Sequence, residues 1–323
     1  MGVPAPGLIE RFRHDLDDLI APGAAVGIAV SGGPDSVALL LLAAAARPRL
    51  IRAATVDHGL RVESSAEAEA VGRLCERLGV PHHVLRPDWS HKPRTAIQEK
   101  ARAARYLLLG EWVLGEQLAA LVTGHHLDDQ AETFLMRLAR GAGVKGLAAM
   151  RGAAAVPGHP SIALLRPLLG WRRSDLGQLC ADAGVPPTTD PSNDDAHFER
   201  VRVRQWLAAS DLLQPDAIAH SAAFLGQADA ALEWATDDAW QRVVTAVEAE
   251  VVVRPAGIPA EIRRRLAQRA VRALATEGDG CDLRRREGER LLLTLHRGGR
   301  ATLRGVLCSG GDEWRFSPAP SRR

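Results

Sequence analysis

Short apolar runs alternate with longer segments of helical spacing through roughly the first two hundred residues of the chain. The apolar runs are typical of buried strands, because they are short and end at Gly, Pro or polar residues. Such alternation predicts a parallel sheet with helices on both faces, the doubly wound form of an α/β fold. The predicted strands are Ala25–Val30, Ile51–Val56, His82–Arg86 and Leu118–Thr123, and the predicted helices are Leu8–Leu19, Val37–Ala46, Ala66–Leu78, Thr95–Trp112 and Asp128–Ala139.

The sequence changes character beyond Ser210, where we expect a second domain. An Ala-rich helix is predicted over Ala217–Ala246, and a helix that is basic on one side near Ile262–Arg272. The stretch Leu291–Phe316 is strand-like, and Ser-Gly-Gly-Asp at Ser309–Asp312 predicts a hairpin turn within it. We therefore predict two domains: residues 1–215 with the doubly wound sheet, and residues 216–323 as a smaller, mostly helical α+β domain.

Composition and cysteine spacing exclude several classes of protein. The longest wholly apolar run, Val37–Ala46, is too short to cross a bilayer, and the N-terminus lacks the apolar core of a signal peptide. We therefore expect a cytosolic protein with no membrane partner. No two of the four cysteines form a Cys-x-x-Cys pair, so neither a zinc ribbon nor an iron–sulfur or sulfur-handling site is indicated. The cysteines are Cys75, Cys180, Cys281 and Cys308.

A glycine-rich loop, Ser31–Ser36, joins the first predicted strand to the next helix. Backbone N–H groups at such a helix start can bind an anion, and glycines keep side chains away from it. Asp35 would repel bound phosphates unless a Mg²⁺ ion lay between them, so the loop predicts a metal bridge. No Gly-Lys-Ser/Thr follows, which excludes a Walker A loop. The alternative is a plain turn between strand and helix.

A second polar constellation, "TGHHLDDQAET" (Thr123–Thr133), follows the strand Leu118–Thr123. Its strand end places it at the carboxyl edge of the sheet, as for the glycine-rich loop, and open α/β sheets bind ligands there. Helical spacing from Asp128 puts Asp129, Glu132 and Thr133 on one face, with His125 a turn earlier. The alternative is a solvated helix start whose acidic residues are favoured by the helix dipole.

The loop and five further blocks occur in an order typical of one enzyme family. "SGGPDS" after a strand resembles the PP-loop of the ATP pyrophosphatases, which cleave ATP to AMP and pyrophosphate while adenylating a substrate. With the other blocks, the chain resembles the tRNA(Ile)-lysidine synthetase family within that superfamily. The blocks are "VDHGLR" (Val56–Arg61), "ARAARY" (Ala101–Tyr106), "TGHHLDDQAETFLMRLARGAGVKGL" (Thr123–Leu147), "RPLL" (Arg166–Leu169) and "DPSNDDAHFERVRVR" (Asp190–Arg204).

This resemblance implies an adenine nucleotide alpha hydrolase-like fold and a defined reaction. The reaction is ATP-dependent ligation of L-lysine to C2 of the wobble cytidine of isoleucine tRNA with a CAU anticodon. It passes through an adenylated cytidine and releases AMP and pyrophosphate. ATP and Mg²⁺ are the implied cofactors, with Asp35 as the metal ligand. The implied ATP-binding residues are Ser31, Gly32, Gly33, Pro34, Asp35, Ser36, Val56, His58 and Gly124.

The resemblance also implies a catalytic set of Asp35, Arg105, His125, Asp129 and Glu132. Arg105 would compensate charge at the α-phosphate, although on helical spacing alone it could be a surface residue. Asp129 and Glu132 would hold the ammonium group of lysine. Its pKa of about 10.4 leaves only about 0.1% neutral amine near pH 7.5, a handicap of about 4 kcal/mol. Desolvation or proton transfer to a carboxylate must offset it, and both routes stay open.

Three arginine groups are candidates for tRNA binding. Arg200 and Arg204 match the family pattern, which the chain departs from at Val201, where Asn is common, and at Thr189, where an acidic residue is common. The basic helix near Ile262–Arg272 is expected to contact phosphates, as are the arginines at 284–290, with Arg284, Arg285 and Arg286 as the named contacts. The alternative is a solvated face, because arginine takes nearly every cationic role in this chain.

Two other functions are alternatives to the ligase. A tRNA thiolase would share the fold but needs reactive cysteines, and a non-catalytic nucleotide- or RNA-binding protein would have a decayed loop. Asp57 and His58 end a strand, where they could line an adenosine pocket or cap the loop. The expected partners are tRNA(Ile) with a CAU anticodon and L-lysine, and a homodimer is kept open.

Overall fold

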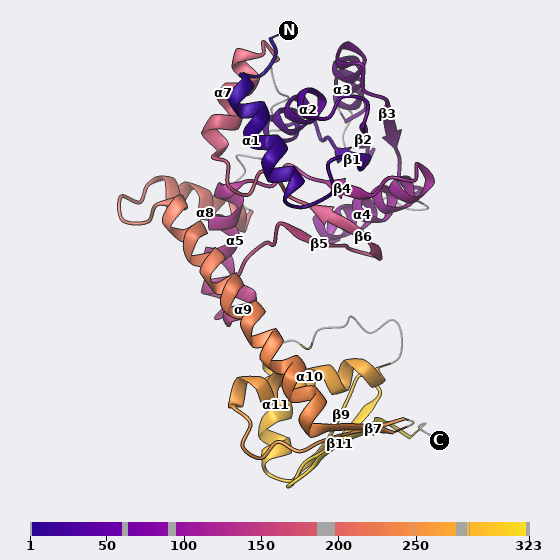
Figure 1. Cartoon of the computed structure of the whole chain (residues 1–323), viewed down its shortest axis with the longest axis vertical. Helices are drawn as coiled ribbons and strands as arrows, with labels where there is room; N and C mark the ends of the chain where they lie inside the picture. Colours follow the sequence, from indigo (N-terminus) through magenta and orange to yellow (C-terminus); the bar gives the residue numbers. More distant parts are fainter. Residues whose placement is uncertain are drawn as a thin grey trace. The chain divides into compact units, whose positions relative to one another are not determined.

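A computed structural model describes residues 2–59, 64–89, 95–185, 198–247, 249–275, 283 and 285–320. The chain divides into two compact units, shown in Figure 1. The first comprises Met1–Gly141 and Gly146–Ala223, and the second comprises Ala142–Lys145 and Phe224–Arg323. The division falls inside helix α9, Pro215–Val243, whose first residue is the predicted domain boundary.

The first unit contains a six-stranded sheet in the order β3-β2-β1-β4-β6-β5. All neighbouring strands are parallel except β5, which pairs antiparallel with β6. This confirms the predicted α/β class, but the β5–β6 hairpin was not predicted, because three of the four residues of β5 are alanines, which do not favour strands. The strands are β1 Val26–Ala29, β2 Ile51–Val56, β3 His82–Leu85, β4 Ala120–Val122, β5 Ala153–Val156 and β6 His159–Leu165.

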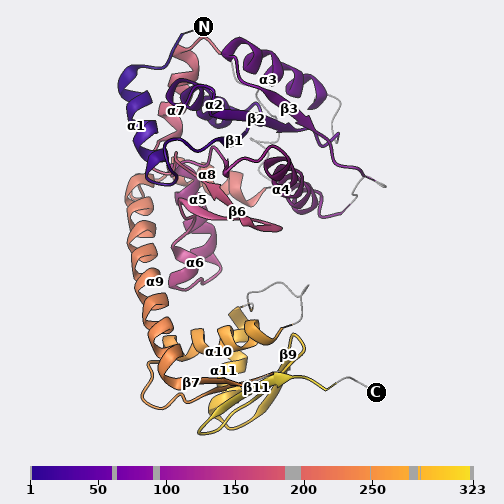
Figure 2. The same cartoon turned by 45° about the vertical axis from the view of Figure 1, so that its right-hand side comes forward.

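Helices cover both faces of this sheet, as Figure 2 shows. Alternate residues of β4 face opposite sides: Ala120 and Val122 pack with α1, α2, α3 and α7, whereas Leu121 packs with α4. None of the described helices is long and apolar enough to cross a membrane. The helices are α1 Pro6–Asp17, α2 Pro34–Ala46, α3 Ser64–Leu78, α4 Ile97–Gly115, α5 Leu127–Ala139, α6 Val144–Leu147, α7 Arg173–Asp182 and α8 Glu199–Ala208.

The second unit contains an antiparallel sheet in the order β7-β8-β11-β10-β9, packed against α10 and α11. The predicted turn at Ser309–Asp312 joins β10 to β11. The prediction of strand from Leu291 was wrong, because Leu291 and Leu295 are one helical turn apart and both buried in α11. The elements are β7 Val244–Val247, β8 Glu250–Val253, α10 Ala260–Leu274, α11 Arg285–His296, β9 Arg300–Leu303, β10 Val306–Ser309 and β11 Trp314–Pro318.

Candidate active site

The glycine-rich loop between β1 and α2 has the geometry of an anion site. Gly32 has a φ of 90°, in the left-handed region that favours glycine. Gly33 is the N-cap and Pro34 the first residue of α2, and no side chain caps this helix. Its first N–H groups are therefore available to an anion. The Ser36 hydroxyl closes the loop, because it accepts from the Ser31 N–H at 3.1 Å and donates to the Gly33 carbonyl at 2.9 Å.

The loop after β4 approaches the loop after β1 at backbone distance. A Cβ atom at Gly124 would lie 2.9 Å from the carbonyl oxygen of Asp35 and 3.2 Å from the nitrogen of Ser36. Only glycine allows this approach without a shift of the backbone. The strand order reverses between β1 and β4, which is the place where open α/β sheets form a ligand crevice.

A cavity of about 540 Å³ opens at these strand ends. It brings together predicted site residues that lie far apart in the sequence. The predicted residues in its lining are Ser31, Gly33, Asp35, Ser36, Val56, His58, Arg105, Gly124, His125, Asp129 and Arg200. Glu132 lies next to this lining, since it contacts Arg200. Their individual roles stay predictions.

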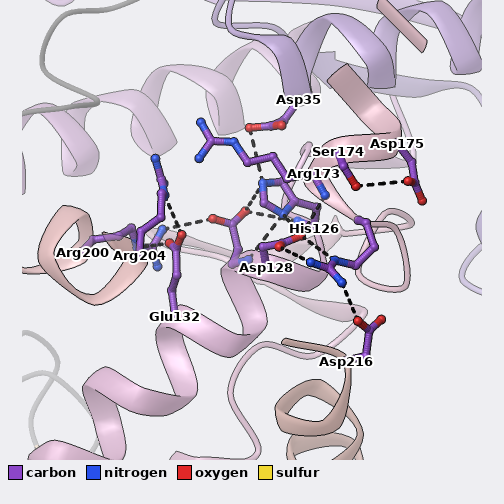
Figure 3. Close-up of polar contacts among 12 residues, drawn as sticks. Asp35, His126, Asp128, Glu132, Arg173, Ser174, Asp175, Arg200, Arg204 and Asp216 are labelled. Atoms are coloured by element: carbon purple, nitrogen blue, oxygen red, sulfur yellow. Dashed lines mark hydrogen bonds and ion pairs between the residues drawn. The ribbon is translucent and has the colours of Figure 1, made fainter. Parts of the chain in front are cut away.

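His126, which was not among the predicted site residues, lies at the centre of the polar contacts (Figure 3). It is buried and is the N-cap of α5. Its Nδ1 accepts from the N–H of Asp129 at 3.4 Å, and its own N–H donates to Asp129 Oδ2 at 3.1 Å. Its Nε2 lies 3.4 Å from Asp35 Oδ2 and 3.6 Å from Asp129 Oδ2. His126 therefore links the two loops.

The charge of His126 is favoured by its neighbours. Burial opposes a charged imidazole, but the hydrogen bond with Asp35 and the carboxylates of Asp129, Asp35 and Asp128 together raise the pKa of His126. Burial likewise opposes ionisation of Asp129, but His126 and Arg200 together hold its pKa below the usual value. Because Nδ1 accepts from the Asp129 N–H, the ring proton lies on Nε2, where it faces the carboxylates of Asp35 and Asp129.

Asp128 connects this cluster to the start of α9. Its Oδ2 accepts from the N–H of Arg173 at 2.8 Å, and its Oδ1 pairs with Arg172 Nη2 at 3.2 Å. Arg172 Nη1 in turn pairs with Asp216, in the first turn of α9, at 2.5 Å (Figure 3). The Asp128 carboxylate is thus held by two residues at the start of α7 and lies 3.7 Å from His126 Nδ1.

His125 differs from His126 in its surroundings. Its Nδ1 lies 2.9 Å from the hydroxyl of Thr123. Burial first, and then Arg166, Arg102 and Arg200, outweigh Asp129 and lower the pKa of His125 to about 4. His125 is therefore a neutral imidazole near pH 7, able to form hydrogen bonds in the cavity without adding charge.

Glu132 is buried and paired with two arginines of α8. Its Oε1 accepts from Arg204 Nε at 2.7 Å, and Arg200 Nε lies 3.5 Å from its Oε2. Arg200 also reaches Asp129 Oδ1 at 3.6 Å and donates to the Thr133 hydroxyl at 2.9 Å. In α8, Arg200 and Arg204 lie one turn apart and share a face. Here these two arginines contact the residues predicted to bind lysine.

Two buried carboxylate oxygens have no hydrogen-bond partner among the described residues: Asp35 Oδ1 and Glu132 Oε2. An orphaned carboxylate oxygen is costly unless a cation or donor reaches it. Asp35 Oδ1, next to the anion-binding loop, fits a Mg²⁺ ion between carboxylate and phosphate. Glu132 Oε2 makes no hydrogen bond with a described residue, although Arg200 Nε lies 3.5 Å away, and could accept one from an ammonium group.

Asp57 and His58, which follow β2, have different surroundings. Asp57 is buried and organises the chain after β2, because its carboxylate accepts from the Gly59 N–H, from the Ser64 and Ser65 hydroxyls and from Arg86. Burial opposes ionisation, but these donors lower the pKa of Asp57 to about 2. His58 lines the cavity, and neither ring nitrogen has a partner among the described residues. Burial and Arg105 lower its pKa to about 4.

Comparison with known proteins assigns the family. A model of the PP-loop domain matches residues 8–210. A tRNA(Ile)-lysidine synthase of Novosphingobium aromaticivorans is 48% identical and covers 100% of this chain and 97% of its own length. The chain belongs to the tRNA(Ile)-lysidine synthase family. Another member, from Zymomonas mobilis, is 41% identical over 92% of this chain and 89% of its own length.

A solved structure supports the fold of this family member at lower similarity. The U34-tRNA thiolase NcsA of Methanococcus maripaludis, solved with its 4Fe-4S cluster, has a TM-score of 0.54 and 17% identity, over 67% of this chain and 76% of its own. The described cysteines do not suit sulfur chemistry: burial raises the pKa of Cys75 and Cys308 to about 12 and, with Asp35, that of Cys180 to about 11. Cys281 lies outside the described residues.

Proposed function

We propose that this protein ligates L-lysine to C2 of the wobble cytidine of isoleucine tRNA with a CAU anticodon, through an adenylated cytidine, releasing AMP and pyrophosphate. Its membership of a PP-loop family implies ATP use. The observation that carries the proposal is one cavity that joins an uncapped helix start to the half-buried carboxylates of Asp35 and Asp129, with the buried Glu132 next to its lining. We also propose that the protein acts in the cytoplasm.

In the first step the C2 oxygen of the cytidine attacks the α-phosphate of ATP, and pyrophosphate leaves. The N–H groups at the start of α2 bind the leaving phosphates. Asp35 would hold Mg²⁺, which neutralises charge on the phosphate oxygens. Arg105, which lines the cavity, compensates charge at the α-phosphate. His126 fixes the Asp35 carboxylate at 3.4 Å from its Nε2.

In the second step the ε-amine of lysine attacks the activated C2 and expels AMP. Asp129 and Glu132 hold the ammonium group, and Glu132 Oε2, which makes no hydrogen bond within the described residues, accepts from it. Two unpaired carboxylates would raise the pKa of the amine further above about 10.4. Arg200 and Arg204 neutralise much of that effect, because they already face both carboxylates. The amine therefore loses its proton more readily than beside bare carboxylates.

A labelled-lysine assay tests this proposal. The purified protein is incubated with ATP, radiolabelled lysine and unmodified isoleucine tRNA bearing a CAU anticodon. We expect label in the nucleoside fraction, with AMP and pyrophosphate formed in equal amounts. A methionine tRNA with the same anticodon is the control and should gain no label. ADP and orthophosphate as products would contradict the adenylation chemistry.

The second unit is proposed to contact tRNA phosphates through α11. Three of the five arginines of α10, a helix that was expected to do so, pair with carboxylates: Arg264 with Glu261, Arg265 with Asp229, Glu233 and Glu261, and Arg269 with Asp237. Among the three named contacts, Arg284 and the side chain of Arg285 lie outside the description, whereas Arg286 is exposed on α11. Arg290, one turn further, is also exposed.

Replacing Arg286 and Arg290 with Ala is expected to weaken tRNA binding and to flatten its dependence on salt. Each phosphate contact that is lost should reduce the slope of log K against log salt by about one. The measurement is tRNA affinity by filter binding across a range of NaCl concentrations. Arg269→Ala removes an arginine that is paired with carboxylates and serves as the control. An unchanged slope in the double variant would show that α11 presents only a solvated face.

A further inference from the structure

One wall of the cavity is cationic and is built from α4, and a further arginine lies at the end of β6, outside the cavity lining. Arg102, Arg105 and Tyr106 occupy positions i, i+3 and i+4 of α4, so they share one helix face, and all three line the cavity. Arg166 directly follows β6, the neighbour of β4. Since β4 ends at the loop containing Gly124 and His125, Arg166 belongs to the same sheet edge as the site.

Within the part of the chain that the structure describes, none of these three arginines pairs with a carboxylate. Arg102 has Tyr106 as its partner: Nη2 lies 3.4 Å from the hydroxyl, and the guanidinium carbon lies 5.0 Å from the ring centroid. Arg166 Nη1 donates to the Arg151 carbonyl at 2.8 Å, while its Nε is buried with no hydrogen bond. Other arginines of the site, such as Arg200 and Arg204, do pair with carboxylates.

Gathering cations without counter-charges is unfavourable in the absence of a ligand. Burial, and then Arg102, lower the pKa of Arg166 against the effect of Tyr106. Arg166 and Arg102 also contribute to the low pKa of His125. An anion bound at this wall would relieve the repulsion, and the planar fork of a guanidinium matches two oxygens of a phosphate.

The position of Arg102 favours an RNA phosphate over a phosphate of ATP. The N–H groups for the triphosphate lie at the start of α2, whereas Arg102 is exposed on the face of α4 that borders the cavity. An enzyme that modifies a base must bring that base into its cavity, while the flanking phosphodiesters stay outside. A solvent-exposed, preorganised guanidinium at the cavity wall suits that backbone.

We propose that Arg102 and Arg166, with Tyr106 orienting Arg102, form a subsite for a phosphodiester of the RNA that flanks the reacting cytidine. The proposal rests on the proposed function, since it requires an RNA substrate at this cavity. It assigns to Arg102 and Arg166 the placement of RNA rather than of ATP.

The test combines a protein variant with neutralised phosphates. Arg102→Ala and the wild-type protein are titrated with anticodon stem–loop RNAs in which one phosphate flanking the wobble cytidine is replaced by a methylphosphonate. We expect one such replacement to weaken wild-type binding about tenfold, and Arg102→Ala to weaken binding of unmodified RNA by a similar factor. The two changes together should be no worse than either alone. The affinity for ATP without RNA should stay within about twofold.

Arg73→Ala, which removes an exposed arginine of α3, is the control and should leave both affinities unchanged. Loss of ATP affinity in Arg102→Ala, with RNA affinity retained, would overturn the proposal and assign Arg102 to the triphosphate. Additive effects of the variant and the methylphosphonate would overturn it too. Failure of the subsite proposal can be distinguished from failure of the proposed function, because lysine incorporation is measured on the wild-type protein alone. RNA coupling without lysine incorporation would uphold the subsite and reject the reaction.

Discussion

Glu132→Gln is expected to abolish lysine transfer while adenylation of the tRNA continues. The amide keeps the size of the carboxylate and can still accept from Arg204, but it removes the charge that would hold the ammonium group. If Glu132 binds lysine as proposed, loss of this charge should lower the transfer rate on the order of a thousandfold. Release of pyrophosphate from ATP, measured with tRNA and without lysine, should stay within about fivefold of wild type.

A matched control for this variant is Glu199→Gln. Glu199 lies on the same helix as Arg200 and Arg204, and the change breaks its exposed ion pair with Arg140. It should leave both half-reactions unchanged, because exposed ion pairs contribute about 0–1 kcal/mol. The melting temperature of each variant shows whether the fold is retained. Lysine transfer at the wild-type rate in Glu132→Gln would mean that the carboxylate only anchors α5 to α8.

The parts of the site that the sequence predicted are those set by local chemistry. The loop at Ser31–Ser36 needs its glycines and Pro34 wherever it occurs, so its sequence specifies its shape. The start of α5 likewise follows from the residues around Asp129. Packing between segments that are distant in the sequence cannot be predicted from such local patterns. The pairing of Glu132 with Arg200 and Arg204 depends on contact between α5 and α8, which no local pattern reports.

Ambiguous local patterns account for the other differences. The predicted catalytic set contains His125 and not its neighbour His126, although His126, three residues before Asp129, has the spacing of a capping box. In the second unit, the run from Leu291 is apolar enough to suit a strand, but it continues a helix whose first turns are charged. Burial of Leu291 and Leu295 on one side of that helix decided the outcome.

His126→Asn is expected to slow both half-reactions on the order of a hundredfold, because misplacement of a reacting group by about 1 Å has an effect of that size. Asn is a favourable N-cap, so the variant should preserve the start of α5. Its side chain is too short to replace His126 Nε2, which lies between Asp35 and Asp129. The Asp35 carboxylate, proposed to hold Mg²⁺, and the Asp129 carboxylate, proposed to hold lysine, should then both lose their fixed positions.

Comparison with His126→Ala separates this linking role from capping. Alanine removes the cap as well, so His126→Ala should have a free energy of unfolding about 1 kcal/mol lower than His126→Asn, with a similar loss of both half-reactions. Pyrophosphate release and lysine transfer are measured for each variant, alongside urea unfolding. If His126→Asn retains wild-type rates while His126→Ala is less stable, His126 serves only as a helix cap. Equal loss of both half-reactions in the two variants would instead support the role of His126 in linking Asp35 to Asp129, because the Asn variant keeps the helix cap.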